Sequence, residues 1–201
     1  MPRPKTRTPQ LREHVLRSAV ALLATDGVDA FTTRRVAADA STSTPAVYEL
    51  FGDRRGLLRE VFFEGFRVLG RDLAAVAATT RPRDDLVATI AAFRRFYREH
   101  PAMARLMFDR PFPDFDPSVE EAAGGRSVRE LIVGRVQRAI DAGAIGGDPT
   151  DVAHVLLALA RGLASVEVAG WLGTSAASVD RRWALAVDAV LGGLSPAVTA
   201  T

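Results

Sequence analysis

The sequence predicts an all-α protein that begins with a small domain of three helices and continues as a larger helical domain. Three observations lead to this prediction. Apolar residues recur at three- and four-residue spacing along most of the chain, no segment alternates with the period of a strand, and hydroxyl residues at 41–43 interrupt one helical pattern before Pro45 opens another. The expected division is an arm at residues 1–9, a helix-turn-helix domain at 10–52 and a helical domain at 53–195.

The composition of the 201-residue chain fits a soluble globular protein, because 48% of its residues are hydrophobic and no apolar run reaches the length of about 18 residues that a membrane span needs. Residues 1–10 lack the apolar core of a signal peptide, so we expect a cytoplasmic protein. The absence of cysteine excludes disulfides and thiolate metal sites, and the three histidines form no close-spaced ligand pair. We therefore expect neither a cofactor nor a metal.

The N-terminal flank consists of an arm and one helix. Residues 1–9 contain three prolines and no apolar core, which indicates a flexible basic arm. Apolar residues then recur at helical spacing over residues 10–25, and Asp26 and Gly27 end the helix. Phe31 is expected to fill the core from the linker that follows.

The stretch 32–51, TTRRVAADASTSTPAVYELF, has the pattern of two short helices joined by a turn. Thr32 is a good N-cap for the first helix, and the hydroxyl residues at 41–43 favour a turn. Pro45 suits the first turn of the second helix, with a cap at position 43 or 44.

The two faces of the second short helix differ. Its apolar residues are Ala46, Val47, Leu50 and Phe51. The other face offers short side chains and Tyr48, so the helix is slim enough to enter a groove, and a helix, a turn and such a second helix make the helix-turn-helix pattern that reads the DNA major groove. An ordinary pair of short core helices is the alternative interpretation.

Charge is distributed unevenly along the chain. The net charge is only +2, but residues 1–59 contain ten basic and six acidic side chains, a net of +4, which leaves about −2 for the rest. A basic N-terminal end on a mildly acidic body fits a protein that meets phosphates with that end. A bias of the genome toward arginine explains the scarcity of lysine, but explains this asymmetry less well.

With its flanks included, the stretch resembles the TetR family of bacterial transcriptional regulators, whose signature runs from a threonine-capped helix to a basic residue before paired leucines. The residues at matching positions are Thr32, Val36, Ala37, Ala40, Ser43, Tyr48, Phe51, Arg54, Leu57 and Leu58. The resemblance is specific over residues 10–60 and continues only as a helical layout. Ser41 replaces the glycine of the turn and Thr42 the valine after it, and a left-handed residue with a side chain costs about 1 kcal/mol.

The resemblance implies binding to double-stranded operator DNA. The residues expected to contact it are Thr32, Arg34, Ser43, Thr44, Pro45, Ala46, Tyr48 and Arg54. Among them Thr32, Tyr48 and Arg54 are expected to touch phosphates, while the slim face of the second helix approaches the bases.

Helical patterns fill the rest of the chain. Asp53 is expected to cap a connecting helix over residues 53–79, and a proline-broken loop is expected at 110–117. The other helices are expected at residues 82–100, 102–109, 118–142, 149–171 and 178–191.

The last two helices are apolar on more than one face, which a small monomer does not bury. One set of faces can pack on the body, and the other can pair with a second copy as a two-fold four-helix bundle. These helices usually form the dimer interface in the TetR family, so the resemblance implies a homodimer here. Dimerisation also suits DNA reading, because one short helix contacts too few bases.

Aromatic and methionine side chains are concentrated in the middle of the chain. A packed core is the plain explanation, but bulky, adaptable residues from several helices also suit an apolar ligand cavity, and the family commonly binds small apolar or amphipathic molecules there. The residues expected to contact a ligand are Phe62, Phe66, Phe93, Tyr97, Met103, Met107, Phe108, Leu157 and Arg161.

Arg161 interrupts the most apolar helix, and a buried arginine needs a partner. Glu167 or a backbone carbonyl would provide one inside the chain, and an anionic group of a ligand is the alternative.

These expectations combine into a DNA-binding transcriptional regulator, a repressor released from its operator by a small apolar or amphipathic effector. A DNA-binding structural or division factor without a small-molecule switch is the alternative. Catalysis is not expected, because the sequence lacks a glycine-rich phosphate loop, a Gly-x-Ser-x-Gly elbow and a close-spaced set of metal ligands.

Overall fold

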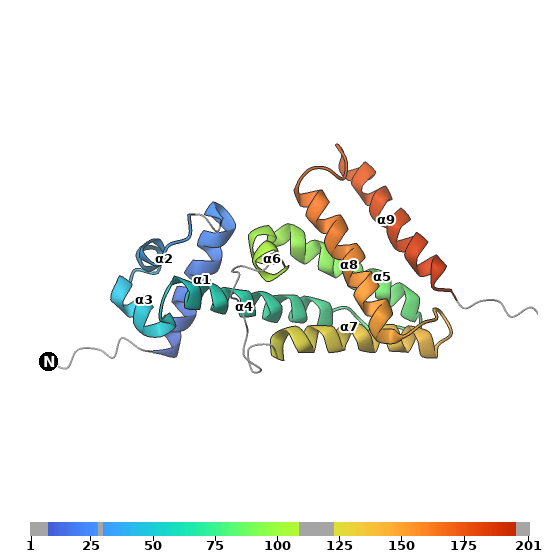
Figure 1. Ribbon diagram of the computed structural model, residues 1–201, viewed down its shortest axis with the longest axis horizontal. Coiled ribbons are helices and arrows are strands. Elements are labelled where there is room, and N and C mark those ends of the chain that lie inside the picture. The colour runs from blue at the N-terminus through green and yellow to red at the C-terminus, as the bar shows by residue number, and fades with distance from the viewer. Residues whose placement is uncertain (1–7, 28–29, 109–122, 196–201) are drawn as a thin grey trace, which may run out of the picture. The chain divides into compact units, whose positions relative to one another are not determined.

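The computed structural model describes residues 8–27, 30–108 and 123–195, which form helices and no strand (Figure 1). The helices are α1 (Pro9–Asp26), α2 (Thr33–Asp39), α3 (Thr44–Phe51), α4 (Arg54–Ala74), α5 (Pro82–Glu99), α6 (Pro101–Phe108), α7 (Ala123–Asp141), α8 (Pro149–Val168) and α9 (Ala176–Gly193). Within these ranges, no helix is both long and apolar enough to cross a membrane. The predicted all-α class is confirmed.

The chain divides into two compact units. The first contains Met1–Arg67 and His100–Glu121, and the second contains Val68–Glu99 and Ala122–Thr201. The first unit therefore holds α1, α2, α3, α6 and the beginning of α4, while the second holds the end of α4 with α5, α7, α8 and α9. The domain boundary predicted at residue 52 precedes α4 and stays a prediction.

The first three helices lie together (Figure 1) and enclose a small apolar core. Its fully buried side chains come from each helix and from the linker before α2: Val15, Ala19, Leu23, Phe31, Val36 and Val47. Thr8, Thr32 and Ser43 cap α1, α2 and α3, because each hydroxyl accepts a hydrogen bond from a backbone amide at 3.1 to 3.3 Å. The core position of Phe31 and the cap at Thr32 are confirmed, and Ser43 is the cap of α3.

The turn between α2 and α3 contains a backbone conformation that disfavours side chains. Ser41 has a φ of 49°, and it is the one non-glycine residue with positive φ in the described part of the chain. The amide of Thr42 donates to the carbonyl oxygen of Ala37 at 2.9 Å, which closes the turn. The left-handed position predicted from the missing turn glycine is therefore present.

The corner between α3 and α4 requires glycine. A Cβ atom at Gly56 would lie 1.9 Å from the carbonyl oxygen of Phe51, so no side chain fits there. Asp53 caps α4 from the same corner, since its carboxylate accepts from the amide of Gly56 at 2.7 Å. The cap predicted at Asp53 is confirmed, and α4 begins close behind the end of α3.

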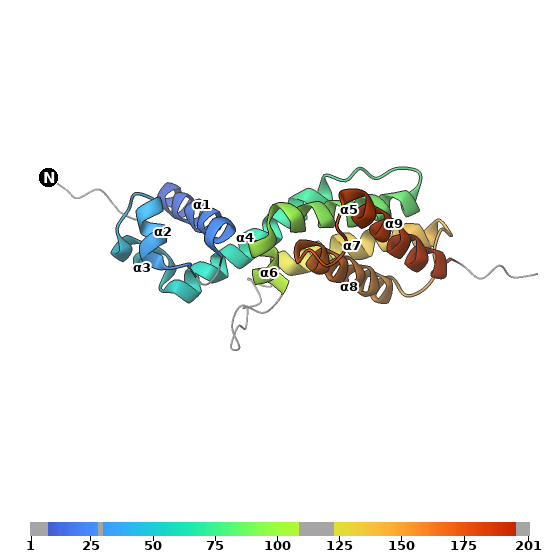
Figure 2. The same ribbon diagram turned by 90° about the horizontal axis from the view of Figure 1, so that it is seen from above.

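The second unit is a helical bundle in which α5, α7 and α8 pack on one another and α9 packs on α8 (Figure 2). Its core is formed by residues from all four helices: Leu86, Ile90, Phe93, Phe96, Tyr97, Val136, Ala139, Val152, Leu156, Ala160, Trp183, Val187 and Leu191.

The end of α4 lies at Ala74 rather than at the predicted residue 79. The guanidinium of Arg135 in α7 donates to the carbonyl oxygens of Leu73 and Val76, at 2.9 and 2.6 Å. The carbonyl oxygen of Leu73 also accepts from the amide of Val76 at 3.2 Å, so the bonds from Arg135 hold the turn that follows α4 and favour the earlier end.

The end of α8 and the segment before α7 can also be compared with the predicted boundaries. α8 ends at Val168 rather than at residue 171, because the chain turns at Gly170, which has a φ of 77°. The predicted start of the preceding long helix at Ser118 and the predicted loop at 110–117 lie outside the described residues.

The loop between α4 and α5 is held by a buried carboxylate. Asp85 accepts hydrogen bonds from the amide and the hydroxyl of Thr79, at 2.9 and 2.7 Å, and forms an ion pair with Arg138 at 3.4 Å. The backbone hydrogen bond of Thr79, followed by its side-chain hydrogen bond and the charge of Arg138, holds the pKa of Asp85 below its ordinary value of 3.8, although burial acts to raise it.

We expect Ser41→Gly to stabilise the protein by about 0.5 to 1 kcal/mol, because glycine adopts a left-handed φ without the clash of a Cβ atom. Ser41→Ala is the matched control, since it keeps the Cβ atom and should give no gain. Urea unfolding monitored by circular dichroism measures both. A Ser41→Gly variant that is less stable than wild type would contradict the strain assigned to this turn.

We expect Asp85→Asn to lower the Tm at neutral pH, with a difference from wild type that shrinks in acid. The folded-state pKa is below the unfolded value, so the carboxylate stabilises the fold fully above 3.8 and loses this contribution as the pH falls through the folded-state pKa. Thermal melts from pH 7 downwards measure the difference. Asp84→Asn is the control, because Asp84 forms only an exposed pair with Arg81. A pH-independent difference for Asp85→Asn would contradict this assignment.

Candidate functional site

The candidate nucleic-acid interface is the outer face of α3. Ala46, Val47 and Phe51 are buried in the domain core. Tyr48, in contrast, is 47% exposed, although it is a large aromatic residue. The helix thus has one face fixed by packing and one open face that presents Pro45, Tyr48 and Glu49, and a helix packed on one face and open on the other can enter a major groove.

The residues predicted to contact DNA differ in their exposure. Thr32, Arg34, Ser43, Pro45 and Tyr48 are exposed, while Thr44 and Arg54 are half-buried. The side chain of Ala46 is only 3% exposed. Its methyl group packs on the core, which argues against the predicted contact of this side chain with a base.

Arg54 connects the beginning of α4 to the linker before α2. Its Nε donates to the carbonyl oxygen of Phe31 at 2.8 Å. Because Thr32 directly follows Phe31 and caps α2, the guanidinium lies beside the start of that helix. Arg54 therefore has a structural bond in addition to its positive charge.

Arg12 holds α3 against α1, a role that the sequence analysis did not assign. One terminal nitrogen donates to the carbonyl oxygen of Leu50 at 3.3 Å, and the other pairs with Glu60 at 2.6 Å. The guanidinium also lies 4.6 Å from the ring centre of Phe51. Helical periodicity places Arg12 on α1 but cannot identify its partners, because these come from two later helices.

The sequence pattern also does not indicate the hydrogen bond between the side chains of Thr33 and Tyr48. The two side-chain oxygens are 3.2 Å apart, and the bond links the first turn of α2 to α3. The basic side chain of Arg35, two residues further on, is bound to Asp26 at the end of α1.

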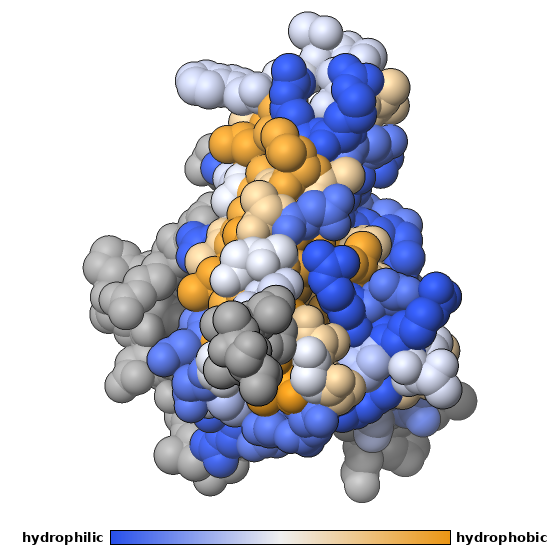
Figure 3. Space-filling model, turned by 90° about the vertical axis from the view of Figure 1, so that its right-hand side faces the viewer, coloured by the Kyte–Doolittle hydropathy of each residue, from blue (hydrophilic) through white to orange (hydrophobic). Residues whose placement is uncertain are grey.

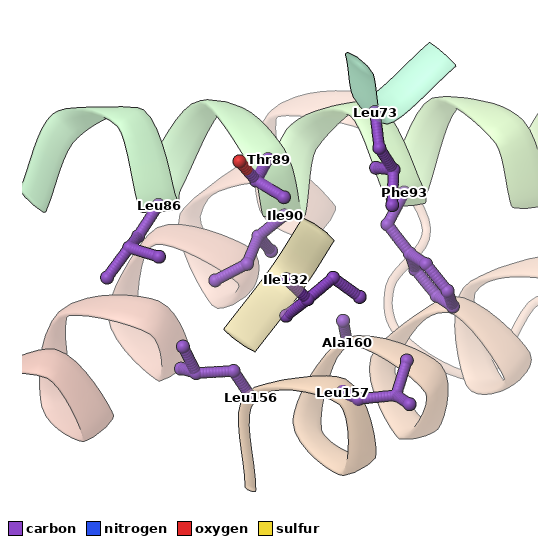
Figure 4. Close-up of a pocket in the computed structure, with 9 residues that line it drawn as sticks. All are labelled: Leu73, Leu86, Thr89, Ile90, Phe93, Ile132, Leu156, Leu157 and Ala160. Atoms are coloured by element: carbon purple, nitrogen blue, oxygen red, sulfur yellow. The ribbon is translucent and has the colours of Figure 1, made fainter. Parts of the chain in front are cut away.

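A second candidate site is an apolar cavity in the second unit, shown in Figure 4. It has a volume of about 30 Å³ and is lined by Leu73, Leu86, Thr89, Ile90, Phe93, Ile132, Leu156, Leu157 and Ala160. The only polar side chain in this lining is Thr89, whose hydroxyl donates to the carbonyl oxygen of Asp85 at 2.7 Å. The lining thus offers apolar contacts and no unused hydroxyl.

Two of the residues predicted to contact a ligand, Phe93 and Leu157, line this cavity. Three others, Phe62, Phe66 and Phe108, form a cluster of edge-to-face ring pairs in the first unit.

The remaining predicted ligand residues are also accounted for by packing, except for Arg161. Met103 and Met107 pack against Gly65, where a Cβ atom would lie 2.3 Å from the sulfur of Met107. Tyr97 is buried in the second unit, with a ring 6.0 Å from that of Phe93.

Arg161 is exposed, so the expectation that it is buried in α8 is wrong. The buried residues of α8 are Val152, Ala153, Leu156, Ala160 and Ala164. Arg161 directly follows the buried Ala160, and one position along a helix turns its side chain away from the core.

Glu167, the internal partner considered for Arg161, binds residues of α5 and α9. Its two carboxylate oxygens accept from Nε and a terminal nitrogen of Arg94, at 2.8 and 2.9 Å, and one also accepts from the indole of Trp183 at 2.6 Å. Arg94 further pairs with Asp180 at 2.7 Å. The hydrogen bond to Glu167 is the main reason that the pKa of Arg94 is raised.

The fold and the α3 surface define a helix-turn-helix regulator with a helical second domain. Residues 15–61 match the family described as bacterial regulatory proteins, tetR family, and residues 86–190 match the Tetracyclin repressor-like C-terminal domain. The chain belongs to the TetR family. It is therefore a DNA-binding transcriptional regulator and not an enzyme, and members of its family bind operator DNA and form dimers.

Solved structures share this fold. A protein of unknown function from Rhodococcus sp. RHA1 is 29% identical, covers 96% of this chain and 100% of its own, and has a TM-score of 0.81. A regulatory protein of the tetR family from Rhodococcus RHA1 is 20% identical over 94% of this chain and 98% of its own, with a TM-score of 0.71. Apo ActR from Streptomyces coelicolor is 19% identical over 94% and 96%, with a TM-score of 0.64. No curated protein sequence matches.

If Arg54 contacts a phosphate as predicted, Arg54→Ala should weaken binding to specific and mixed-sequence duplexes by the same factor and reduce the slope of the salt dependence by about 0.9 for each protomer. Arg54→Lys separates the two roles, since it keeps the charge but not the Nε bond to Phe31. Fluorescence anisotropy over a series of salt concentrations measures both variants. Arg95→Ala, which removes an exposed arginine of α5, is the control. An unchanged slope for Arg54→Ala would exclude the phosphate contact.

Proposed function

We propose that the chain is a dimeric repressor that binds a near-palindromic operator with α3 and leaves it when a small apolar or amphipathic ligand enters the second unit. The observation that supports the DNA-reading part is the open face of α3, which combines short side chains in its first turn with the exposed Tyr48 and Glu49. A helix of this shape can approach base edges closely.

The proposed DNA contacts divide into two groups. Thr44, Pro45 and the backbone of Ala46 approach the bases with the first turn of α3. The residues proposed for the phosphates or the neighbouring backbone are Thr32, Arg34, Ser43, Tyr48 and Arg54. The caps of α2 and α3 support this second group, because helix N-termini present backbone amides that favour anions.

The proposed dimer interface is the outer face of α8 and α9. Of the seven exposed large hydrophobic residues in the described part of the chain, five lie on these helices or in the turn between them: Val155, Val166, Val168, Trp171 and Leu185. Figure 3, which faces this side of the molecule, shows a band of hydrophobic residues bordered by hydrophilic ones. An exposed apolar band of this kind is typical of a protein-protein interface, and a two-fold pairing of both helices would cover it.

We expect Leu185→Glu to convert the dimer to a monomer and to weaken operator binding by at least about a hundredfold, because a monomer reads only one half-site. Leu185 is 71% exposed in the single chain, so the charge should leave the folded monomer intact. Val87→Glu is the matched control, because Val87 is an exposed apolar residue of α5. Sedimentation and anisotropy measure mass and affinity. A Leu185→Glu dimer with wild-type affinity would contradict this interface.

The apolar cavity supports the ligand-release part of the proposal. Leu73 belongs to α4, so a ligand that widens the cavity would press on the last turn of this helix. α4 continues without a break to Arg54, beside the linker of the helix-turn-helix domain. Shifting the protein from 99% to 1% competent for DNA takes about 5.5 kcal/mol of differential binding, which burial of apolar surface at about 25 cal/mol per Å² in two protomers can supply.

A second candidate function is a DNA-binding factor without a small-molecule switch. The observation that favours it is the size of the cavity, about 30 Å³, whereas ligand pockets usually have about 300 Å³ or more. The ligand-release proposal therefore requires that the cavity expands when a ligand enters.

A ligand screen with a cavity variant distinguishes the two functions. Thermal melts with hexane, benzene and limonene identify compounds that stabilise wild type, and Ala160→Val, which fills the cavity, should lose this stabilisation while Ala91→Val, on the exposed side of α5, keeps it. A compound with this behaviour should lower the affinity of the protein for DNA, and by linkage DNA should lower the affinity for the compound by the same factor. If such a compound binds but DNA affinity stays within about twofold, the factor without a switch is the better assignment.

A further inference from the structure

Thr33 is a buried polar residue whose side chain bonds a different kind of partner from those of the other buried polar residues. Among the described residues, three polar side chains are buried: Thr33, Asp85 and Thr89. Asp85 binds the loop before its own helix, and Thr89 donates to the carbonyl oxygen of residue 85 in its own helix. Thr33, only 7% exposed, instead bonds the hydroxyl of Tyr48, an exposed side chain on the DNA-facing surface of α3.

The position of Thr33 in α2 explains why its hydroxyl takes this partner. A threonine inside a helix commonly donates to the carbonyl four residues earlier. Thr33 is the first residue of α2 and follows the cap Thr32, so the helix provides no such carbonyl for it. Its hydroxyl therefore has to find a partner outside α2, and the phenol oxygen of Tyr48 lies 3.2 Å away.

We propose that Thr33 is a positioning residue for DNA binding: its hydroxyl donates to Tyr48, and the phenol proton of Tyr48 is thereby directed to a phosphate oxygen. This inference rests on the proposed phosphate contact of Tyr48. A hydroxyl has one proton and two lone pairs, so a phenol that accepts from Thr33 still has its own proton to donate.

The chemistry of the phosphate determines the direction of this chain of hydrogen bonds. A phosphate diester oxygen accepts and does not donate, so Tyr48 has to use its proton on the phosphate. The opposite direction, with Tyr48 donating to Thr33, would direct a phenol lone pair at the anion and leave the buried proton of Thr33 without this partner. Accepting from Thr33 also polarises the phenol and strengthens its bond to a charged acceptor.

A double-mutant cycle tests the proposal with Thr33→Val, which replaces the hydroxyl by a methyl group, and Tyr48→Phe, which removes the phenol oxygen. The probe is a mixed-sequence duplex of about 30 base pairs at low salt, long enough for two half-sites, because a phosphate contact does not depend on sequence. Anisotropy gives the Kd of wild type, both single variants and the double variant. Circular dichroism melts of each protein give the folded fraction at the assay temperature.

We expect Tyr48→Phe to raise the Kd about tenfold and Thr33→Val about threefold, since each protomer loses or weakens a hydrogen bond to a charged group. In the Tyr48→Phe background, Thr33→Val should have no further effect, because Thr33 acts only through the phenol. Thr33→Ser, which restores the hydroxyl, should bind like wild type. The salt slope should stay unchanged in all four proteins, because no charge is removed.

Each other outcome contradicts a defined part of this account. If Thr33→Val weakens binding equally with and without the phenol, or if Thr33→Ser fails to restore affinity in a folded protein, Thr33 only supports the fold. If Tyr48→Phe weakens binding but Thr33→Val does not, the positioning role is wrong while the Tyr48 contact stands. If Tyr48→Phe binds like wild type, the proposed phosphate contact of Tyr48 itself is wrong, and the role of Thr33 fails with it.

Discussion

The half-buried carboxylate of Glu167 imposes the main constraint on the second unit. A charge in a helical bundle has to be paired, and both of its oxygens are bound by Arg94 of α5, with the indole of Trp183 in α9 as a third donor. Removing one partner of such a pair destabilises the fold, because the other charge is left half-buried without its main partner. Three helices are therefore held in one register by a single acidic group.

The two candidate surfaces of the second unit follow from this register. Phe93 precedes Arg94 in α5 and lines the apolar cavity, together with Leu157 and Ala160 of α8. The turn of α8 that directs Glu167 inward leaves Val166 exposed, and Leu185 of α9 is exposed two residues after the buried Trp183. One ion pair thus links helices that line the cavity, α5 and α8, to the helices proposed to bind a second copy, α8 and α9.

Local chemistry made much of the helix-turn-helix domain predictable. Thr32 and Pro45 mark helix starts, Phe31 is the large apolar residue of the linker before α2, and Ser41 occupies the position where the family signature has a turn glycine. These features depend on a few consecutive residues. The extent of α4 was overestimated, because the bonds from Arg135 that favour its end come from a helix about 60 residues further along the chain.

The candidate sites were less predictable, because they depend on which side chains meet. The periodicity of α8 does not decide that Glu167 pairs with Arg94 while Arg161 faces outward, since both residues occur in an apolar helix. Aromatic and methionine residues suggested one ligand cavity, yet packing divides them between a ring cluster around Phe66 and a cavity beside Phe93. Composition identifies the residue types that can line a cavity, whereas the position of the cavity depends on how helices distant in sequence pack.

The central claim, that two copies of α3 read one operator together, is tested most directly by changing the distance between the half-sites. Two recognition helices of a rigid dimer have to meet successive major grooves on one side of the duplex. After the operator has been located by footprinting, inserting about five base pairs at its centre turns one half-site to the opposite side of the duplex, and inserting about ten restores the side but lengthens the distance between the half-sites. The half-turn insertion should lower the affinity for the operator to the level of mixed-sequence DNA. Unchanged affinity for that operator would contradict joint reading by a dimer.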